Sequence, residues 1–503
     1  MIKSNVFVIL QTVLIALLLF TGMLSHAQSS QPNVIYVYAD DLGYGELGCY
    51  GQQKIKTPFI DKLASEGIRF TQHYSGAPVC APSRCMLLTG KHAGHSYIRG
   101  NYELGGFEDE AEGGQMPLPD NTFTIARLMK QAGYTTGAIG KWGLGMASTT
   151  GNPNNQGFDY FYGYLDQKQA HNYYPTHLWE NGQWDTLNNP FIYVHHPLPA
   201  ANNNIEDFKR YKGNDYAIKK MGDKAVQFID KNKDHAFFLY LAFTIPHVSL
   251  QVPDEELAAY KGSFDEQPYH GENGYAPCFF PLSTYAAMIS YLDKQVGRVM
   301  QALQKFNLDE NTIVMFSSDN GATFDVGGVN TAFFNSTGGL RGRKMDLYEG
   351  GIRQPFVARW PAKIPSGKTS DLISSQIDVM ATLSQLTGVE ALPNDGISFL
   401  QTLLGRESEQ QHHPYLYFEY PEKNGQVAIR MGEWKGVRTD VKKDSGAPWQ
   451  IFNLKNDIAE SENVAAQHPM LAEKFDAIQK KEHQQSHLRE WEFIDPKFKT
   501  RKE

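Results

Sequence analysis

The stretch N-V-I-Y-V-Y-A at residues 33–39 is followed directly by Asp40 and Asp41. Most of its residues are β-branched or aromatic, which is typical of a strand buried on both faces of a parallel sheet. Ligands of open α/β sheets bind outside the carboxyl ends of the strands, which is where the two acidic residues lie. This stretch therefore predicts both a central strand and one edge of a binding site.

The rest of the chain repeats this pattern. Short apolar runs of the same character occur at residues 135–139, 236–243, 312–316 and 355–359. Segments with helical spacing lie between them, at residues 58–66, 122–131, 217–232 and 282–306. The alternation predicts an α/β fold with a large, mainly parallel mixed sheet sandwiched by helices.

Polar groups follow four of the predicted strands. The first strand leads into Asp40-Asp41, and the others lead into Gly140-Lys141, Pro246-His247 and Asp319-Asn320-Gly321. Each group alone could be a solvated loop. Because the carboxyl ends of parallel strands meet at one edge of a sheet, we expect the four groups to converge on one crevice.

The chain divides into four parts by composition. Residues 1–27 have a positive start at Lys3, an apolar run and the small-x-small sequence Ser25-His26-Ala27, which predicts a cleaved secretory signal peptide rather than a retained membrane anchor. Residues 28–405 form the expected catalytic domain. Short alternating runs and a helical segment at 470–485 predict a C-terminal subdomain at 406–495, an antiparallel sheet with a helix. Residues 496–503 are a basic tail.

Composition limits the kind of ligand. Lys and Arg number 47 against 55 Asp and Glu, a formal net charge of −8 in 503 residues. That balance gives no support to nucleic-acid binding. An anionic substrate must instead be captured by a local cluster of positive charge, because the overall field repels it.

The chain has four cysteines, Cys49, Cys80, Cys85 and Cys278. Their irregular spacing is not that of a disulfide framework, and no paired Cys or His spacing indicates zinc. For Cys49, Cys85 and Cys278 we expect a packing role or a single disulfide.

Candidate site residues fall into two chemical groups. Asp40, Asp41, Asp319 and Asn320 offer hard oxygen ligands, which suit Ca²⁺ or Mg²⁺. A cationic set around such a metal would trap a tetrahedral oxyanion; its candidates are Arg84, Lys141, Lys344, His92 and His247. Cys80 precedes Ala81-Pro82-Ser83-Arg84, which is expected to form the first turn of a helix, and so Cys80 is the candidate nucleophile.

These residues resemble one family. Residues 80–90, C-A-P-S-R-C-M-L-L-T-G, are similar to the C-x-P-S-R-x-x-L-x-T-G signature of type I, formylglycine-dependent sulfatases, which are arylsulfatase-like enzymes of the alkaline phosphatase superfamily. The resemblance extends from residue 33 to about residue 463. It includes D-D-L-G at 40–43, G-K-W at 140–142, P-H at 246–247, S-D-N-G at 318–321, L-R-G-R-K at 340–344, E-G-G at 349–351 and I-F-N-L-K-N-D at 451–457.

The resemblance implies a mechanism. A maturation enzyme would oxidise Cys80 to formylglycine, whose hydrate attacks sulfur and then expels sulfate as the aldehyde reforms. One calcium ion would be held by Asp40, Asp41, Asp319, Asn320 and the modified Cys80. Arg84 would hold the hydrate, Lys141 and Lys344 the sulfate oxygens, and His247 would act as acid on the leaving oxygen. Lys91 would share in orienting the nucleophile, with His92 as a bystander.

The sequence departs from the family pattern at one position. Many members have K-W-H-L-G, with a histidine that helps to activate the hydrate, but this chain has Gly143 there. His171 is our candidate to replace it; the alternative is a hydrogen-bonded loop histidine.

The sequence thus predicts an exported, periplasmic or secreted, calcium-dependent sulfatase acting on a sulfated carbohydrate such as a polysaccharide, or on an aryl sulfate. The aromatic and polar loops at 171–185 and 269–280 favour a saccharide. The alternatives are a phosphoester or phosphonate ester hydrolase of the same superfamily, and a non-catalytic sulfated-glycan binder in which Cys80 stays a thiol. The sugar, the sulfate position, exo or endo action and the oligomeric state are left open.

Overall fold

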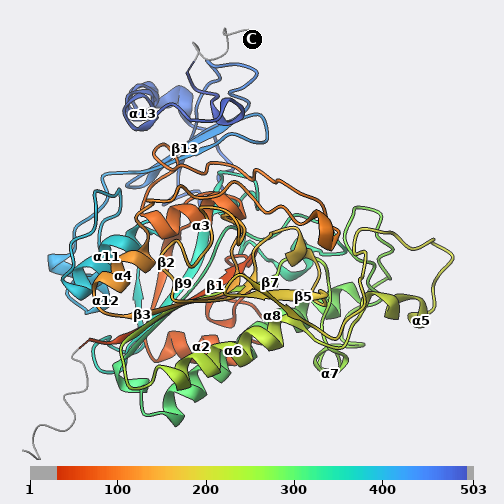
Figure 1. Ribbon diagram of the computed structural model, residues 1–503. Coiled ribbons are helices and arrows are strands. Elements are labelled where there is room, and N and C mark those ends of the chain that lie inside the picture. Colours follow the sequence, from red (N-terminus) through yellow and green to blue (C-terminus); the bar gives the residue numbers. More distant parts are fainter. Residues whose placement is uncertain (1–30, 496–503) are drawn as a thin grey trace, which may run out of the picture.

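The structure, a computed structural model, describes residues 31–495. Its main sheet has eleven strands, ten of them in the order β10-β2-β9-β8-β1-β7-β3-β4-β5-β6, with β11 paired to β2 (Figure 1). The strands are β1 (Asn33–Asp40), β2 (Ile68–Tyr74), β3 (Thr135–Lys141), β4 (Tyr160–Tyr164), β5 (His177–Glu180), β6 (Gln183–Thr186), β7 (Phe237–Pro246), β8 (Thr312–Ser318), β9 (Arg353–Arg359), β10 (Lys368–Ser370) and β11 (Ser374–Ser375).

The predicted strands form the centre of this sheet. β1 is buried along all eight residues and pairs in parallel with β7 on one side and β8 on the other. β3 runs parallel to β7, so the ends of β8, β1, β7 and β3 lie next to one another at one edge. β9 is antiparallel to β8 and to β2, which makes the sheet mixed. The expected fold class is therefore confirmed.

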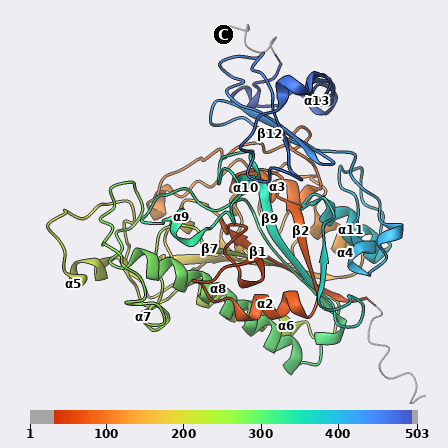
Figure 2. The same ribbon diagram turned by 180° about the vertical axis from the view of Figure 1, so that it is seen from behind.

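Helices cover both faces of the sheet (Figures 1 and 2). One face is covered by α2 (Pro58–Ser65), α6 (Ala217–Lys231) and α8 (Pro281–Lys305), and the other by α3 (Cys80–Thr89), α4 (Ile125–Gln131) and α11 (Asp378–Thr387). Shorter helices lie in the connections: α5 (Ile205–Phe208), α7 (Asp254–Leu257), α9 (Thr331–Phe334), α10 (Glu349–Ile352) and α12 (Leu400–Leu403). Each face has its own apolar core, because alternate β1 side chains pack on opposite sides.

A second sheet follows in the C-terminal part. Its four antiparallel strands are β12 (Leu416–Tyr420), β13 (Gln426–Met431), β14 (Trp434–Arg438) and β15 (Gln450–Asn453), and α13 (Pro469–Glu482) packs on it through Phe475 and Ile478. The expected small sheet with a helix is thus present, while the boundary at residue 405 stays a prediction. The predicted signal peptide and basic tail lie outside residues 31–495. Within those residues, no helix combines the length and the apolar character that a membrane crossing requires.

A buried ion cluster joins the two sheets. Lys435 of β14 has no exposed surface, and its Nζ lies 2.9 Å from Glu349 Oε1 and 3.1 Å from Glu460 Oε1. Glu349, the first residue of α10, also accepts hydrogen bonds from Tyr74 Oη at 2.8 Å and Arg353 Nη1 at 3.2 Å. The cluster therefore fixes β14 against the loop that precedes β9.

Replacing Lys435 by methionine is expected to destabilise the protein strongly. The change leaves the buried Glu460 without its cation and Glu349 with Arg353 alone, which costs about 3–5 kcal/mol in free energy of unfolding. Urea denaturation followed by fluorescence measures this loss. Lys455→Met is the matched control, because Lys455 pairs with Glu433 at 2.7 Å on the surface, and its midpoint should not move. Equal midpoints for the two variants would contradict the assigned role of Lys435.

Candidate active site

The structure brings the four polar groups at the strand ends together. Asp40 is the last residue of β1, Lys141 the last of β3, and His247 and Asp319 directly follow β7 and β8. Ligand atoms of Asp40, Asp41, His247 and Cys80 all lie within 4.8 Å of one another, and all four residues are buried. The convergence expected from parallel strands is therefore present.

Cys80 enters this cluster from the first residue of α3. Its Sγ lies 3.3 Å from Asp40 Oδ1. Burial and then the negative charge of Asp40 raise the pKa of the Cys80 thiol well above its usual value. The unmodified side chain is thus a neutral thiol, which makes a weak nucleophile.

Three buried cations surround the carboxylates. Arg84 Nη2 lies 2.9 Å from Asp319 Oδ2, and Lys141 Nζ lies 2.7 Å from Asp40 Oδ2. Lys344, from the loop before α10, places its Nζ 2.8 Å from Asp41 Oδ2. Each carboxylate therefore has at least one cationic partner, and Asp40 has a second in Arg84 at 3.4 Å.

The oxygen atoms fit a hard divalent cation. Asn320 Oδ1 is buried and has no hydrogen-bond partner among residues 31–495, while its Nδ2 donates to Asp41 Oδ1 at 2.8 Å. Burial and repulsion by the negative charge of Asp40 raise the pKa of Asp319 to about 7. A cation bound among Asp40, Asp41, Asp319 and Asn320 would relieve this repulsion and use the free amide oxygen, and an all-oxygen set suits Ca²⁺ or Mg²⁺.

A wall of aromatic and imidazole rings stands beside this cluster. The rings of His171 and His247 are stacked, with centroids 5.0 Å apart. His171 Nδ1 lies 3.3 Å from His195 Nε2, and the His195 ring lies 4.0 Å from Phe107 and 5.4 Å from Tyr275. The structure thus places His171 against His247, while its role as a replacement for the missing histidine stays a prediction.

Gly143 leaves no room for the histidine that many sulfatases have at this position. Its φ is +76°, and a Cβ there would lie 2.7 Å from Gln167 Cγ. A side chain at 143 would therefore need a local rearrangement. Sequence reasoning missed the contribution of His195, which lies in an irregular loop and carries no pattern that signals it.

His92 lies outside the cationic set, in agreement with the bystander role that the family resemblance implied. It lies in the turn after α3, where its Nε2 is 3.1 Å from Glu482 Oε2 of α13. It is therefore held by a different carboxylate cluster at the far end of the helix from Cys80. The role suggested for Lys91 stays a prediction.

The other cysteines agree with packing roles. All four cysteines are free, and Cys85 and Cys278 are buried. Cys85 Sγ lies 3.4 Å from Ser96 Oγ on the side of α3 that packs into the core. The alternative of a single disulfide is therefore wrong in this structure.

The chain matches known sulfatases over most of its length. Residues 32–389 match the Sulfatase family, and residues 342–488 match the family described as N-sulphoglucosamine sulphohydrolase, C-terminal. An N-acetylgalactosamine-6-O-sulfatase of Bacteroides thetaiotaomicron is 32% identical over 502 residues, covering 88% of this chain and 91% of the relative. A steryl-sulfatase of Rattus norvegicus is 31% identical, covering 76% of this chain and 72% of that protein.

Solved structures show the same similarity. The crystal structure of Ps i-CgsB in complex with k-i-k-neocarrahexaose aligns with a TM-score of 0.73 at 28% identity, covering 93% of this chain and 96% of that one. Together with the sequence relatives, this likeness extends over both sheets. The chain belongs to the sulfatase family of the alkaline phosphatase superfamily and is a sulfuric ester hydrolase.

Proposed function

We propose that this sulfatase removes sulfate from a sulfated carbohydrate, with residue 80 as formylglycine and one calcium ion in the site. The observation that carries the proposal is the meeting of Cys80 with three carboxylates, one free amide oxygen and three buried cations. A site of this composition binds a tetrahedral oxyanion beside a metal and stabilises the charge that develops on transfer.

The chain's own cations would orient the sulfate group. Lys141 at the end of β3 is buried, and the side chain of Lys344 in the loop before α10 is only 9% exposed, so the two can hold two sulfate oxygens while Arg84 holds residue 80. Their positions are fixed by ion pairs before substrate arrives, which limits the reorganisation that transfer requires. Calcium would add positive charge beside Asp40, Asp41, Asp319 and Asn320, and formylglycine would supply an oxygen nucleophile at position 80.

His247 is placed to protonate the leaving oxygen. Its Nδ1–H donates to the Val248 carbonyl, which directs Nε2 toward the cluster, 3.7 Å from Asp41 Oδ2. Burial and the charge of Lys344 lower the pKa of His247 to about 4 in the substrate-free protein. A bound sulfate ester brings a negative charge that favours the imidazolium, so the acid is formed when it is needed.

Carbohydrate is the substrate class that the ring wall and the relatives support. Phe107, Tyr275 and His195 offer apolar ring faces next to polar groups, a combination suited to a sugar ring. The N-acetylgalactosamine-6-O-sulfatase and the neocarrahexaose complex named above point to the same class.

Turnover of matched sulfate and phosphate esters tests the proposed reaction. We expect 4-nitrophenyl sulfate or a sulfated sugar to be hydrolysed with a kcat/KM at least about 100-fold above that of the matching phosphate ester. The phosphate ester would have the higher kcat/KM if the site belonged to a phosphoester hydrolase, because a metal ion and cationic side chains suit either tetrahedral anion.

The His171–His195 pair gives a sharper prediction. If His195 fixes the tautomer and orientation of His171, His171→Ala and His195→Ala should each lower kcat about 10–100-fold, with little change in KM. Because the two residues act as one unit, the double variant should lose little more than His171→Ala alone. Steady-state kinetics on all three variants measures these changes in kcat. A loss in the double variant equal to the product of the two single losses would contradict the pairing.

Export is part of the proposal. A signal peptide at residues 1–27 would leave a mature chain that begins at Gln28. Formylglycine formation requires a maturation enzyme as a partner in the producing cell. N-terminal sequencing of the protein from its native host determines where the mature chain begins.

A further inference from the structure

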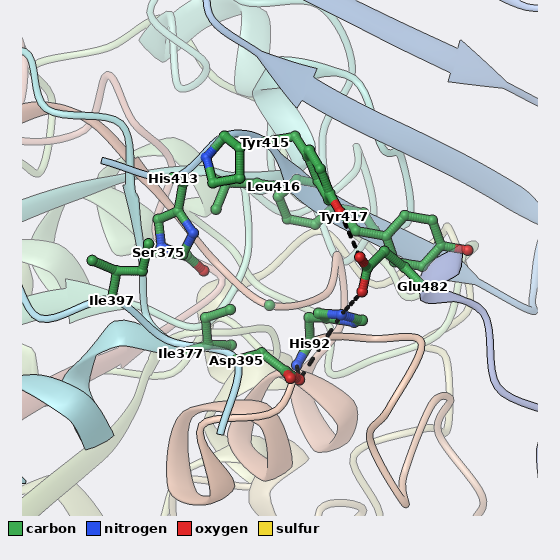
Figure 3. Close-up of a pocket in the computed structure, with 13 residues that line it drawn as sticks. His92, Ser375, Ile377, Asp395, Ile397, His413, Tyr415, Leu416, Tyr417 and Glu482 are labelled. Carbon is green, nitrogen blue, oxygen red and sulfur yellow. Dashed lines mark hydrogen bonds and ion pairs between the residues drawn. The ribbon is translucent and has the colours of Figure 1, made fainter. Parts of the chain in front are cut away.

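A second cluster of histidines and carboxylates lies away from the active site, between the two sheets. His92 and His95 come from the turn after α3, Asp395 from the loop before α12, and Glu482 is the last residue of α13. The cluster borders a cavity of about 200 Å³ that is also lined by His413 (Figure 3). It has no part in the sulfatase chemistry described above.

Three of these side chains converge on one point. Glu482 Oε2 lies 3.1 Å from His92 Nε2 and 4.0 Å from His95 Nε2. The two imidazole rings are stacked with centroids 4.0 Å apart, so both present nitrogen toward the same carboxylate. The potential ligand atoms of His92, His95 and Glu482 all lie within 4.8 Å of one another.

We propose that His92, His95 and Glu482 form a binding site for a divalent transition metal, with Zn²⁺ as the preferred ion. The bound metal would link α13 to the turn after α3. Tetrahedral Zn²⁺ with Zn–N and Zn–O bonds of 2.0–2.2 Å separates its ligand atoms by about 3.3 Å. The two separations from Glu482 Oε2, 3.1 Å and 4.0 Å, differ from that value by less than 1 Å, and the two imidazole nitrogens lie within 4.8 Å of each other, a gap that side-chain rotation can close. Water from the adjoining cavity supplies the fourth ligand.

The surroundings hold two of the ligands in place. Asp395 lies 3.0 Å from His95 Nδ1, the carboxylate contact that commonly fixes a metal-binding imidazole with Nε2 free. Glu482 Oε1 accepts hydrogen bonds from Tyr415 Oη at 2.5 Å and Lys481 Nζ at 2.6 Å. This leaves Oε2 directed at His92 (Figure 3).

His92 must rearrange when the metal binds. The Gly94 N–H donates to His92 Nδ1 at 3.1 Å, so in the metal-free protein Nε2 carries the ring hydrogen and donates it to Glu482. Binding through Nε2 moves that hydrogen to Nδ1 and breaks the Gly94 contact. We therefore expect the turn at 92–95 to shift on loading.

The ligand set separates this site from the proposed calcium site. Two imidazoles with one carboxylate favour Zn²⁺, Co²⁺ or Ni²⁺, whereas the oxygen set of Asp40, Asp41, Asp319 and Asn320 favours Ca²⁺. Zinc binding measured in the presence of saturating Ca²⁺ therefore reports on this cluster. The readout is binding rather than turnover, so its outcome is independent of the proposed sulfatase mechanism.

Two titrations test the proposal on the full-length protein stripped of transition metals and held in excess Ca²⁺. Isothermal titration with ZnCl₂ should show one tight site, and CoCl₂ should give the intense visible absorption of tetrahedral Co²⁺ rather than the weak bands of hexaaqua ions. His95→Gln and Glu482→Gln keep side-chain volume and should each weaken Zn²⁺ binding at least about 30-fold. Exposed His412→Gln is the control and should bind as the unmodified chain does.

Circular dichroism confirms that the variants are folded. If His95→Gln is not folded, His92→Gln takes its place with the same expected loss. Absence of a tetrahedral Co²⁺ spectrum, or Zn²⁺ affinity that is equal in the unmodified chain and in the folded variants, would overturn the proposal and leave the cluster as a set of hydrogen-bonded ion pairs.

Discussion

Replacing Cys80 by alanine is expected to abolish sulfatase turnover, with kcat falling roughly 10⁵-fold, because the side chain proposed as the source of the nucleophile is gone. The rest of the site should remain in place. Within the described part of the chain, the Cys80 side chain makes one polar contact, with Asp40, and Asp40 keeps its ion pairs with Lys141 and Arg84. Substrate binding should consequently survive the loss of turnover. Steady-state kinetics with an aryl sulfate and equilibrium binding of a sulfated sugar separate the two effects.

Cys85→Ala is the matched control, since Cys85 lies on the same helix and is equally buried. Its loss removes a small packing group and should leave kcat within about threefold of the unmodified chain. Turnover by the Cys80→Ala variant would contradict the assignment of the nucleophile. So would a Cys85→Ala variant that has lost as much activity as is expected for Cys80→Ala.

Removing one carboxylate of the proposed calcium site should have the second-largest effect. Asp319→Asn preserves shape but takes one negative charge from the oxygen set, and Arg84 loses its 2.9 Å partner. We expect Ca²⁺ to bind about 100-fold more weakly and kcat/KM to fall about 10³-fold. Calcium titration of the EDTA-treated protein, followed by turnover, measures both quantities.

Asp230→Asn is the control for that experiment. Asp230 lies on α6 and pairs with Lys233 on the surface, so neither calcium affinity nor turnover should change. Calcium should also restore turnover to the EDTA-treated unmodified chain. Full activity of Asp319→Asn in EDTA would contradict the metal assignment.

The strands that could be predicted from the sequence are those with a continuous run of apolar residues. β1, β3, β7, β8 and β9 are buried on both faces and read as continuous apolar runs, so their existence and order could be inferred. β2 was missed because Arg69, Gln72 and His73 interrupt its apolar pattern. The short hairpin of β5 and β6 was missed because its pairing, rather than its composition, makes it a strand pair.

The site residues that lie at the ends of strands or at the start of α3 could be predicted from the sequence. Asp40, Lys141, His247 and Asp319 follow from the topology of a parallel sheet, and Cys80 from the start of α3. His92 was first grouped with the cations because it is close to them in sequence, and the family resemblance then identified it as a bystander. α3 runs from Cys80 to Thr89, so a full helix of about 15 Å separates the two ends. His195 was beyond prediction, because a long-range loop contact leaves no local pattern.

Mass spectrometry of the tryptic peptide at residues 70–84 directly tests whether residue 80 is formylglycine. In active protein purified from its native host, we expect the mass of an aldehyde, or its hydrate, in place of the thiol at position 80. Active protein that carries only the unmodified thiol in this peptide would contradict this expectation.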